Sequence, residues 1–332
     1  MSETIVIAGM ARTPMGGLLG CLSSLTASEL GASAIRAAVE RAGVAADDVD
    51  EVIMGNVLPA GQGQAPARQA ALGAGLPLGT GCTTINKMCG SGMKAIMLAA
   101  DTLRAGNARV MVAGGMESMS NAPYLLAKAR AGYRLGHGEV KDHMFLDGLE
   151  DAYEKGRLMG SFAEDCVTKY EFSRGAQDRF AITSLERART ANEDGSFAAE
   201  IVPVEVKSRK RVTTVERDEQ PFNANPDKIP DLKPAFKPDG TITAGNASSI
   251  SDGAAAVVLM TQSEAASRGI RPIARIVGQT GHAQEPGWFT TAPVGAMQKL
   301  FAATGWNAGS VDLYEINEAF AVVTMAAMIE FD

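Results

Sequence analysis

The chain has few of the residues and patterns that mark metal sites, membrane spans or nucleic-acid-binding surfaces. Its four cysteines and three histidines follow no zinc-site or CxxC spacing, so we expect no metal site. No apolar run approaches about 18 residues, and the first residues lack the segments of a signal peptide, so neither a membrane span nor export is predicted. A net charge of −7 disfavours general nucleic-acid binding. We therefore expect a protein of a reducing compartment, most simply the cytoplasm.

Motifs for phosphates and dinucleotides are also missing. There is no GxxxxGK[ST], and Gly61-Gln-Gly63 lacks the third glycine of a dinucleotide fingerprint because Pro66 stands at that position. The absence of GxSxG argues against a hydrolase nucleophile elbow. The basic run Lys207–Arg211 is interpreted as a solvated edge strand rather than as a phosphate site.

Small and apolar residues are abundant, whereas charged residues are distributed unevenly. Hydrophobic residues make up 46% of the chain and glycines number 36, which predicts an ordered core of closely packed layers. Residues 1–119 contain 17 charged residues, residues 120–245 contain 40 and residues 246–332 contain 12. The charged middle indicates a solvated insertion. We predict an N-terminal half over 1–119 plus 246–270, an inserted domain over 120–245 and a C-terminal half over 271–332.

Both flanks alternate short apolar runs with helical patterns, which predicts an α/β fold with a mostly parallel sheet covered on both faces. A possible capping box, Thr26 with Glu29, opens a helix with Leu30 and Ala38 on its apolar face. Further helices are predicted at 65–75, 90–106, 292–305 and 319–331. Strands are predicted at 4–9, 49–58, 108–115, 254–260, 272–280 and 311–316.

The order of elements in the second flank repeats that of the first, which predicts two similar halves. The second flank stops at Asp332, directly after a helical pattern and without a C-cap glycine, a further strand or a polar tail. We therefore expect the second half to be incomplete.

The segment 86-NKMCGSGMKA-95 places Cys89 at the predicted junction of a strand and an apolar helix. Only a thiolate is a good nucleophile, and the unpaired N–H groups and partial positive charge at a helix N-terminus favour a thiolate. Gly90 and Gly92 would leave room for a substrate and permit backbone angles that other residues avoid. Cys89 is therefore a candidate nucleophile, and a small buried cysteine at a tight turn is the alternative. The other three cysteines lack this setting and are interpreted as core residues.

A second junction of the same kind is predicted within 315-EINEAFAV-322, where it carries Asn317. A side-chain amide at this place could hold a water or a carbonyl group for oxyanion stabilisation. On its own pattern, however, an ordinary N-cap asparagine is the better interpretation.

The motifs NKMCGSGMKA, AGGMESMSNAPY, AGNASSISDGAAA and EINEAFAV, in this order and spacing, resemble the thiolase family and within it the acetyl-CoA acetyltransferases. The resemblance runs from residue 4 to the end of the chain. It implies two βαβαβαββ halves in αβαβα layers, with an inserted loop domain that holds coenzyme A. It also implies that Cys89 takes the acetyl group of acetyl-CoA as a thioester, and that a second acetyl-CoA then condenses with it, reversibly, to give acetoacetyl-CoA and CoA.

The resemblance further implies roles for individual residues. Asn317 would anchor a water at an oxyanion site. The pocket for coenzyme A and the acyl group would be lined by Leu149, Met159, Phe236, Ala244, Ser248, Ala319 and Phe320. Because coenzyme A thioesters are the substrates, no separate cofactor is expected, and the resemblance implies a homodimer or homotetramer.

The chain also departs from the family. Relatives carry a histidine in a GHP motif and a second cysteine in a CxGGG motif after NEAF, whereas here no histidine follows His282 and no cysteine follows Cys166. Leu158 stands where some relatives have a substrate-facing histidine, and 218-DEQPF-222 lacks an arginine that some use near coenzyme A. Because acid–base work on a thiol and an α-carbon needs two titrating groups, we expect impaired turnover.

Three alternatives stay open at this point. The chain could be a broad-chain 3-ketoacyl-CoA thiolase of fatty-acid degradation or a non-catalytic thiolase-like subunit that binds coenzyme A. It could also be an unrelated cysteine hydrolase. That reading needs a histidine near Cys89, and all three histidines lie in the charged insertion or beyond it.

Overall fold

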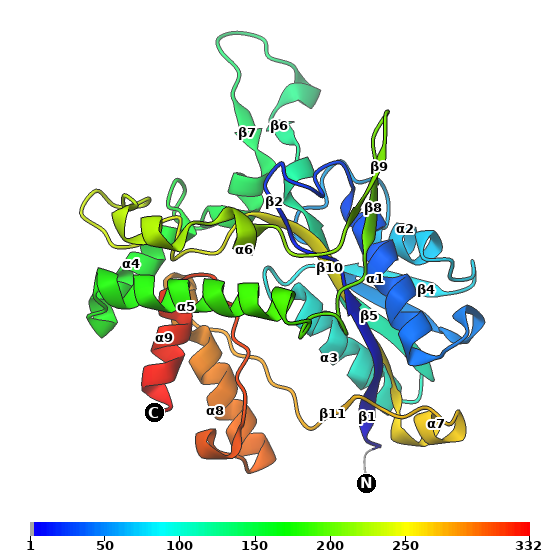
Figure 1. Cartoon of the computed structure of the whole chain (residues 1–332). Coiled ribbons are helices and arrows are strands. Elements are labelled where there is room, and N and C mark those ends of the chain that lie inside the picture. The colour runs from blue at the N-terminus through cyan, green and yellow to red at the C-terminus, as the bar shows by residue number, and fades with distance from the viewer. Residues whose placement is uncertain (1–2) are drawn as a thin grey trace. The chain divides into compact units, whose positions relative to one another are not determined.

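The computed structural model describes residues 3–332, which form two compact units. Unit 1 contains the described residues up to Leu149, together with Asn192–Gln220 and Ile250–Ile276. Unit 2 contains Glu150–Ala191, Pro221–Ser249 and Val277–Asp332. Figure 1 labels most helices and strands of both. The three-part division predicted from the charge distribution stays a prediction.

Unit 1 is built on a seven-stranded sheet of order β11-β1-β10-β5-β3-β4, with β2 beside β10. Its strands are β1 (Ile5–Arg12), β2 (Gly16–Gly17), β3 (Glu51–Gly55), β4 (Gly81–Ile85), β5 (Val110–Ser118), β10 (Ser251–Thr261) and β11 (Ala274–Ile276).

The sheet is mixed, so the prediction of a mostly parallel sheet is wrong. Among the described strands only β3 forms parallel pairs, with β4 and β5, whereas β10 pairs antiparallel with both β1 and β5. Short helical crossovers connect strands that run in parallel. The connection from β5 to β10 is instead a long excursion over residues 119–250, and β10 runs antiparallel to β5.

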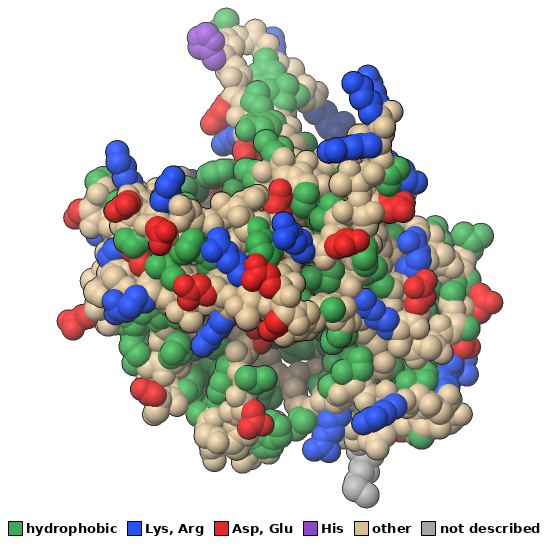
Figure 2. Space-filling model, viewed as in Figure 1, with side chains coloured by type: hydrophobic (Ala, Val, Ile, Leu, Met, Phe, Trp, Pro, Cys, Tyr) green, Lys and Arg blue, Asp and Glu red, His purple; other side chains and the backbone are tan. Residues whose placement is uncertain are grey.

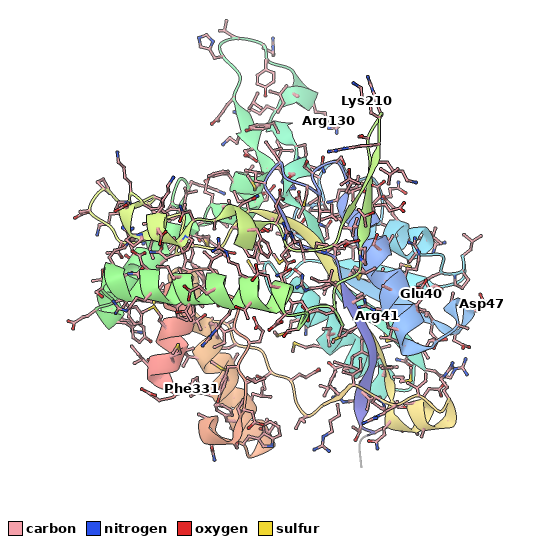
Figure 3. The ribbon with its side chains drawn as sticks, viewed as in Figure 1. Glu40, Arg41, Asp47, Arg130, Lys210 and Phe331 are labelled. Carbon is pink, nitrogen blue, oxygen red and sulfur yellow. The ribbon has the colours of Figure 1, made fainter. Side chains whose placement is uncertain are left out.

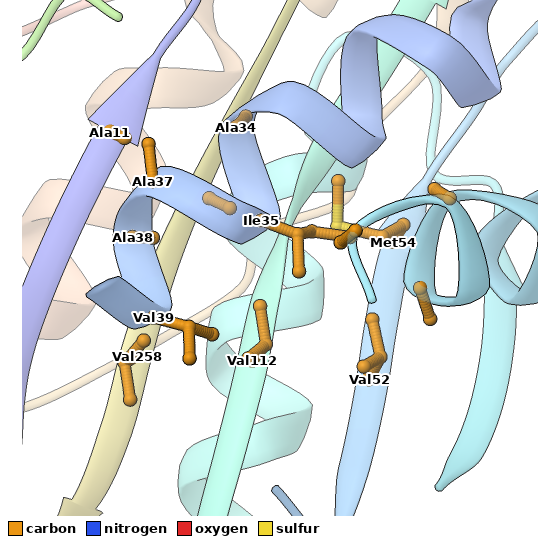
Figure 4. Packing of buried hydrophobic residues seen from close by; sticks show 14 of the residues in the cluster. Ala11, Ala34, Ile35, Ala37, Ala38, Val39, Val52, Met54, Val112 and Val258 are labelled. Atoms are coloured by element: carbon orange, nitrogen blue, oxygen red, sulfur yellow. The ribbon is translucent and has the colours of Figure 1, made fainter. Parts of the chain in front are cut away.

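Helices cover both faces of the sheet, as predicted. On one face lie α1 (Ala27–Ala42) and α2 (Pro66–Gly73), and on the other lies α3 (Ser91–Arg104). Figure 4 shows Ile35 and Val39 of α1 facing Val112 of β5 and Val258 of β10. Thr26 and Glu29 form the predicted capping box. The short helices η1 (Ala46–Asp48) and α7 (Gln262–Ser267) complete the layers.

Two excursions leave the body of unit 1. Strands β6 (Tyr124–Leu126) and β7 (Val140–Asp142) pair in one, with the turns η2 (Met119–Asn121), η3 (Ala129–Ala131) and a π-helical turn η4 (Phe145–Leu149) around them. In the other, β8 (Val204–Lys207) and β9 (Val212–Val215) form a hairpin. The basic run forms the hairpin's tip, where Figure 2 shows basic side chains and Figure 3 places Lys210. The tip is exposed, as expected for a solvated edge.

Unit 2 is helical around an apolar core. Its elements are α4 (Met159–Tyr170), α5 (Arg174–Glu193, which ends in unit 1), α6 (Gln220–Asn223), η5 (Pro226–Asp231), η6 (Pro286–Thr291), α8 (Ala292–Thr304), η7 (Ala308–Ser310) and α9 (Ala321–Glu330). Its buried core includes Cys166, Ile242, Phe320 and Val323.

The second half differs from its prediction in two places. The expected strand at 272–280 shortens to β11, which pairs with β1 at the edge of the first sheet. The strand expected at 311–316 is absent, and Leu313 is 89% exposed. A strand needs hydrogen-bonded neighbours, and no described strand pairs with this segment.

An ion-pair network holds the segment 192–220 against β1. Arg12 donates two hydrogen bonds to the carboxylate of Asp218, at 2.7 and 3.0 Å, and a third to Glu200 at 2.5 Å. Asp218, which is 6% exposed, also accepts from Met15 N and from the amide of Asn192. Because these charges are paired and hydrogen-bonded, the network can stay buried.

Replacing Asp218 with asparagine is expected to lower the free energy of unfolding at neutral pH and to flatten its acid dependence. Burial raises the pKa of Asp218, but hydrogen bonds from Arg12, Met15 N and Asn192 outweigh burial and hold that pKa below its usual value. A carboxyl of this kind stabilises the fold above its unfolded pKa of about 3.9. That contribution is lost as pH falls through the lower folded pKa.

Urea unfolding from neutral pH down to about pH 3 checks this prediction. The wild-type chain should lose more stability over this range than Asp218→Asn does. Equal losses in the two proteins would show that Asp218 does not contribute to the acid dependence.

Candidate active site

Cys89 lies where the sequence places it, at the junction of β4 and α3 in unit 1. Strand β4 ends at Ile85, Gly90 is the N-cap of α3, and the helix begins at Ser91. Cys89 is exposed and carries no disulfide. The alternative of a small buried cysteine is therefore wrong.

The segment 86–91, called here the nucleophile turn, is held by its own side chains. Met88 N donates to Asn86 Oδ1 at 2.9 Å. Ser91 Oγ donates to Met88 O at 2.5 Å and accepts from Lys87 N at 2.8 Å. These bonds fix the backbone on both sides of Cys89, so the thiol sits on a defined turn.

The left-handed residue of this turn is Met88, with φ of 49°, and not a glycine. Gly90 has φ of −87° and Gly92 lies inside α3, so the expectation that glycines supply unusual backbone angles is wrong. An αL conformation in a residue with a side chain costs free energy of the order of 1 kcal/mol or more and is concentrated at functional sites. The hydrogen bonds of Asn86 and Ser91 to Met88 oppose that cost.

Glycines instead allow α3 to approach the sheet closely. A Cβ built on Gly55, at the end of β3, would lie 2.5 Å from Ser91 Cβ and 2.7 Å from Ser91 C. Gly115 in β5 would meet Gly92 Cα at 3.3 Å. The first turn of α3 therefore rests on bare backbone at the carboxyl ends of two strands.

The remaining predicted residues divide between the units. Leu149 ends the π-helical turn η4 of unit 1. Unit 2 carries the other seven, which are Met159, Phe236, Ala244, Ser248, Asn317, Ala319 and Phe320.

Several of these seven lie together. The rings of Phe236 and Phe320 meet edge to face, with centroids 6.0 Å apart. Met159 and Ala319 are half-buried against the same cluster as Phe320. Ser248 N donates to Ala319 O at 2.9 Å, so the segment with Ser248 lies beside NEAF.

Two buried polar residues, which the sequence analysis did not identify, hold the segment 241–248. Glu164 Oε1 accepts from Thr241 N and Ile242 N, both at 2.7 Å. Asn246 Oδ1 accepts from Thr243 N at 2.8 Å, and the carbonyl oxygen of Asn246 accepts from Ala321 N at the start of α9. The segment that carries Ala244 and Ser248 is thereby joined to α4 and to α9.

Replacing Glu164 with alanine is expected to destabilise the chain by about 2 kcal/mol or more, because two buried N–H groups lose their acceptor. Glu164 is 6% exposed, so water cannot readily replace the carboxylate. Urea unfolding measures the loss. Glu186→Ala, at an exposed site on α5, is the control and should change stability by less than about 0.5 kcal/mol. Similar values for the two variants would contradict the role given to Glu164.

Asn317 is not an N-cap, so the interpretation favoured by its own pattern is wrong. Helix α9 begins at Ala321, and Phe320 is its N-cap residue without a side-chain bond. Asn317 is exposed, three residues before that cap. Its neighbour Glu318 accepts a hydrogen bond from Ser184 Oγ of α5 at 2.9 Å, which ties NEAF to that helix.

A cavity of about 500 Å³ in unit 2 contains none of the predicted site residues. Its lining consists of Asp151, Tyr153, Glu154, Arg157, Phe162, Asp165, Glu285, Pro286, Gly287 and Trp288. These residues offer carboxylates and aromatic rings but no thiol, so we place the candidate site at Cys89. No group of three or more His, Cys, Asp or Glu within residues 3–332 is arranged to hold a metal ion.

Comparisons with known proteins identify the class of the chain. Residues 5–263 match the family described as thiolase, N-terminal domain, and residues 270–332 match thiolase, C-terminal domain. The chain therefore belongs to the thiolase family. A solved structure of an acetyl-CoA acetyltransferase from Syntrophomonas wolfei aligns with a TM-score of 0.95 at 38% identity, over 99% of this chain and 83% of that one. The fold implied by the motifs is thus confirmed as the thiolase fold.

Two curated relatives carry the name of a particular thiolase activity. Acetyl-CoA acetyltransferase 2 of Arabidopsis thaliana is 54% identical over 97% of this chain and 80% of its own length. Acetyl-CoA acetyltransferase of Schizosaccharomyces pombe is 49% identical over 98% of this chain and 83% of its own length. These comparisons do not bear out the expectation of an incomplete second half. Within residues 3–332, no helix is both long and apolar enough to cross a membrane.

Proposed function

We propose that the chain is an acetyl-CoA C-acetyltransferase that condenses two molecules of acetyl-CoA to acetoacetyl-CoA and CoA, and catalyses thiolysis in reverse. The observation that carries this proposal is the exposed Cys89 on its fixed turn at the start of α3. It stands in a thiolase-family chain whose relatives, at about half identical residues, are named for this activity.

The first half-reaction uses Cys89 as a covalent nucleophile. The Cys89 thiolate attacks the carbonyl carbon of acetyl-CoA and forms a new C–S bond, and the bond from that carbon to the CoA sulfur breaks. CoA leaves as a thiolate and takes up a proton. Covalent catalysis of this kind divides one difficult step into two easier ones.

In the second half-reaction the α-carbon of another acetyl-CoA, having lost a proton, attacks the acetyl carbonyl on Cys89. A C–C bond forms, the bond to Cys89 Sγ breaks and leaves Cys89 as a thiolate, and acetoacetyl-CoA leaves. The proton lost from the α-carbon balances the proton that CoA takes up in the first half-reaction. We propose that Asn317 holds a water for the developing oxyanion. Coenzyme A and the acyl group would contact Leu149, Met159, Phe236, Ala244, Ser248, Ala319 and Phe320.

The test is the intact mass of the protein after incubation with acetyl-CoA, followed by peptide mapping. An acetyl adduct on Cys89 is the expected result, and a folded protein that forms none would reject the proposal. Neither the structure nor the comparisons support the predicted impairment of turnover, and the measured condensation rate will decide it. Comparable rates with longer acyl chains would instead favour the broad-chain 3-ketoacyl-CoA thiolase.

Assembly, cofactor use and location remain part of the proposal. We propose a homodimer or homotetramer that uses coenzyme A thioesters without a further cofactor. We also propose the cytoplasm as its location. A relative from Gibberella zeae is named cytosolic, which supports this choice, although two from Xenopus laevis are named mitochondrial. Light scattering tests the assembly, and cell fractionation tests the location.

A further inference from the structure

Glu117, near the end of β5 in unit 1, has a half-buried carboxylate surrounded by hydrogen-bond donors. Its Oε1 accepts from Asn56 Nδ2 at 2.7 Å and from Leu58 N at 3.2 Å, and its Oε2 accepts from Val57 N at 2.7 Å. Burial raises the pKa of Glu117 above its usual value, although the N–H groups of Val57 and Leu58 and the nearby His143 oppose this. The carboxylate thus holds the segment that follows β3.

This segment is hydrogen-bonded to the nucleophile turn. Val57 O accepts from Asn86 Nδ2 at 3.2 Å, and the other end of the same amide, Asn86 Oδ1, accepts from Met88 N at 2.9 Å. Asn56 N also donates to Ile85 O at 3.0 Å, one residue before the turn. A continuous chain of bonds therefore leads from Glu117 to the left-handed residue next to Cys89.

The same segment supports the turn that carries Leu149. A Cβ built on Gly148 would lie 3.4 Å from Leu58 Cδ2, so Leu58 packs directly against this turn. Two residues further along, Ala60 N donates to His143 Nε2 at 3.4 Å, and His143 Nδ1 lies 2.6 Å from Asp147 Oδ2. The two ring nitrogens of His143 thus link the segment after β3 to the turn that carries Leu149.

We propose that Glu117 is a positioning residue for acyl transfer, which holds the nucleophile turn and the Leu149 turn in fixed relation through the segment 56–60. The proposal rests on the proposed role of Cys89 as nucleophile. The hydrogen bonds of Glu117 go to Asn56, Val57 and Leu58 and not to Cys89, so Glu117 acts through Asn86 and Leu58. A displacement of about 1 Å at a reacting group can cost about 100-fold in rate, so a residue of this kind can matter at a distance.

Asp50 provides a matched control at the opposite ends of the same strands. Its Oδ2 accepts from Arg109 N at 2.7 Å and from Val110 N at 3.0 Å, at the start of β5. Like Glu117, it is a carboxylate that binds two backbone N–H groups between β3 and β5. It has no bond to the nucleophile turn. Loss of either carboxylate should therefore destabilise the sheet, whereas only loss of Glu117 should slow the chemistry at Cys89.

The experiment compares Glu117→Gln with Asp50→Ala in the full chain. Glutamine keeps the size of Glu117 but places an NH₂ group against donors that both carboxylate oxygens now accept from. Two rates are measured together with the melting temperature: acetylation of Cys89 by acetyl-CoA, and its alkylation by iodoacetamide, which needs no coenzyme A pocket. We expect Glu117→Gln to lower the acetylation rate about tenfold or more, and to slow alkylation as well. Asp50→Ala should lower the melting temperature about as much as Glu117→Gln does. It should nevertheless leave both rates within about twofold of wild type.

Asn86 supplies a second variant that keeps the proposal testable if Glu117→Gln does not fold. Asn86 is exposed, so Asn86→Ala removes the link without disturbing the core. It should slow both reactions, and the double variant should react no more slowly than the slower single one, because the two residues act in one chain. A purely structural role predicts neither result for the rates.

The experiment distinguishes failure of the role proposed for Glu117 from failure of the proposed function. Wild-type rates in Glu117→Gln or in Asn86→Ala, equal losses in Asp50→Ala, or multiplying losses in the double variant would each overturn the role of Glu117. If the wild-type chain is alkylated at Cys89 but never acetylated, the proposed function fails. The alkylation series then still decides whether Glu117 positions the thiol.

Discussion

Cys89→Ser should form no acetyl adduct and should lower the condensation rate by at least about 10⁴-fold, because removal of a covalent nucleophile leaves only binding and polar stabilisation. Serine keeps the size of the side chain and the hydrogen bonds around Met88. Its hydroxyl stays protonated at neutral pH, which makes it a much weaker nucleophile than a thiolate. Intact mass and initial rates with acetyl-CoA measure both effects.

The other cysteines serve as internal controls. Burial, together with the carboxylate of Glu219, raises the pKa of Cys21 to about 12. Burial also raises the pKa of Cys82 and of Cys166 above the usual thiol value. These thiols should stay protonated and unreactive at neutral pH. Cys82→Ser, in the strand that leads to the nucleophile turn, should therefore acetylate as wild type does. An adduct on any of the three in Cys89→Ser would contradict the assignment of the nucleophile.

Local patterns in the sequence were sufficient where one short segment determines the structure. The capping box of Thr26 and Glu29, the apolar face with Leu30 and Ala38, and the junction at Cys89 all depend on neighbours within a few residues. The buried strand runs of β1, β5 and β10 were found for the same reason, although their ends shifted by a few residues.

Features that depend on distant partners were not predicted. The direction of β10 between β1 and β5 is set by tertiary packing, and periodicity carries no information on it. The segment 311–316 has a strand pattern without a described strand beside it. The apolar pattern of this segment is that of a strand, but the pattern does not show whether a neighbouring strand is present to pair with it.

The residues that hold the nucleophile turn were not predicted from the sequence, for a related reason. Asn86 and Ser91 stand inside the motif that drew attention to Cys89, and a polar residue at a strand end or at the first position of a helix is a usable signal. Glu117 gives no such signal, because its partners lie about 60 residues away in the segment after β3. The sequence predicts unusual backbone angles at Gly90 and Gly92, whereas the left-handed residue is Met88. The close approach of Gly55 to Ser91 can be recognised only from the three-dimensional structure.

Gly55→Ala is expected to lower the acetylation rate of Cys89 about 100-fold and to destabilise the chain by about 1–3 kcal/mol. The new Cβ would lie 2.5 Å from Ser91 Cβ, 2.7 Å from Ser91 C and 2.9 Å from Gly92 N. Two of these atoms belong to the helix backbone, so a change of side-chain rotamer cannot relieve the overlap. Either β3 or the start of α3 must move, and the nucleophile turn moves with α3.

Gly79→Ala is the matched control, because no atom lies within 4 Å of a Cβ built there. It also lies in unit 1, in the connection before β4, and its melting temperature should be unchanged or slightly raised, since alanine restricts the unfolded chain. Acetylation of Cys89 by acetyl-CoA and thermal unfolding are measured for both variants. A Gly55→Ala protein that acetylates at the wild-type rate would show that α3 can retreat from the sheet without displacing the thiol. The position of the Cys89 thiol would then depend on the hydrogen bonds within the nucleophile turn and not on the packing of α3 against β3.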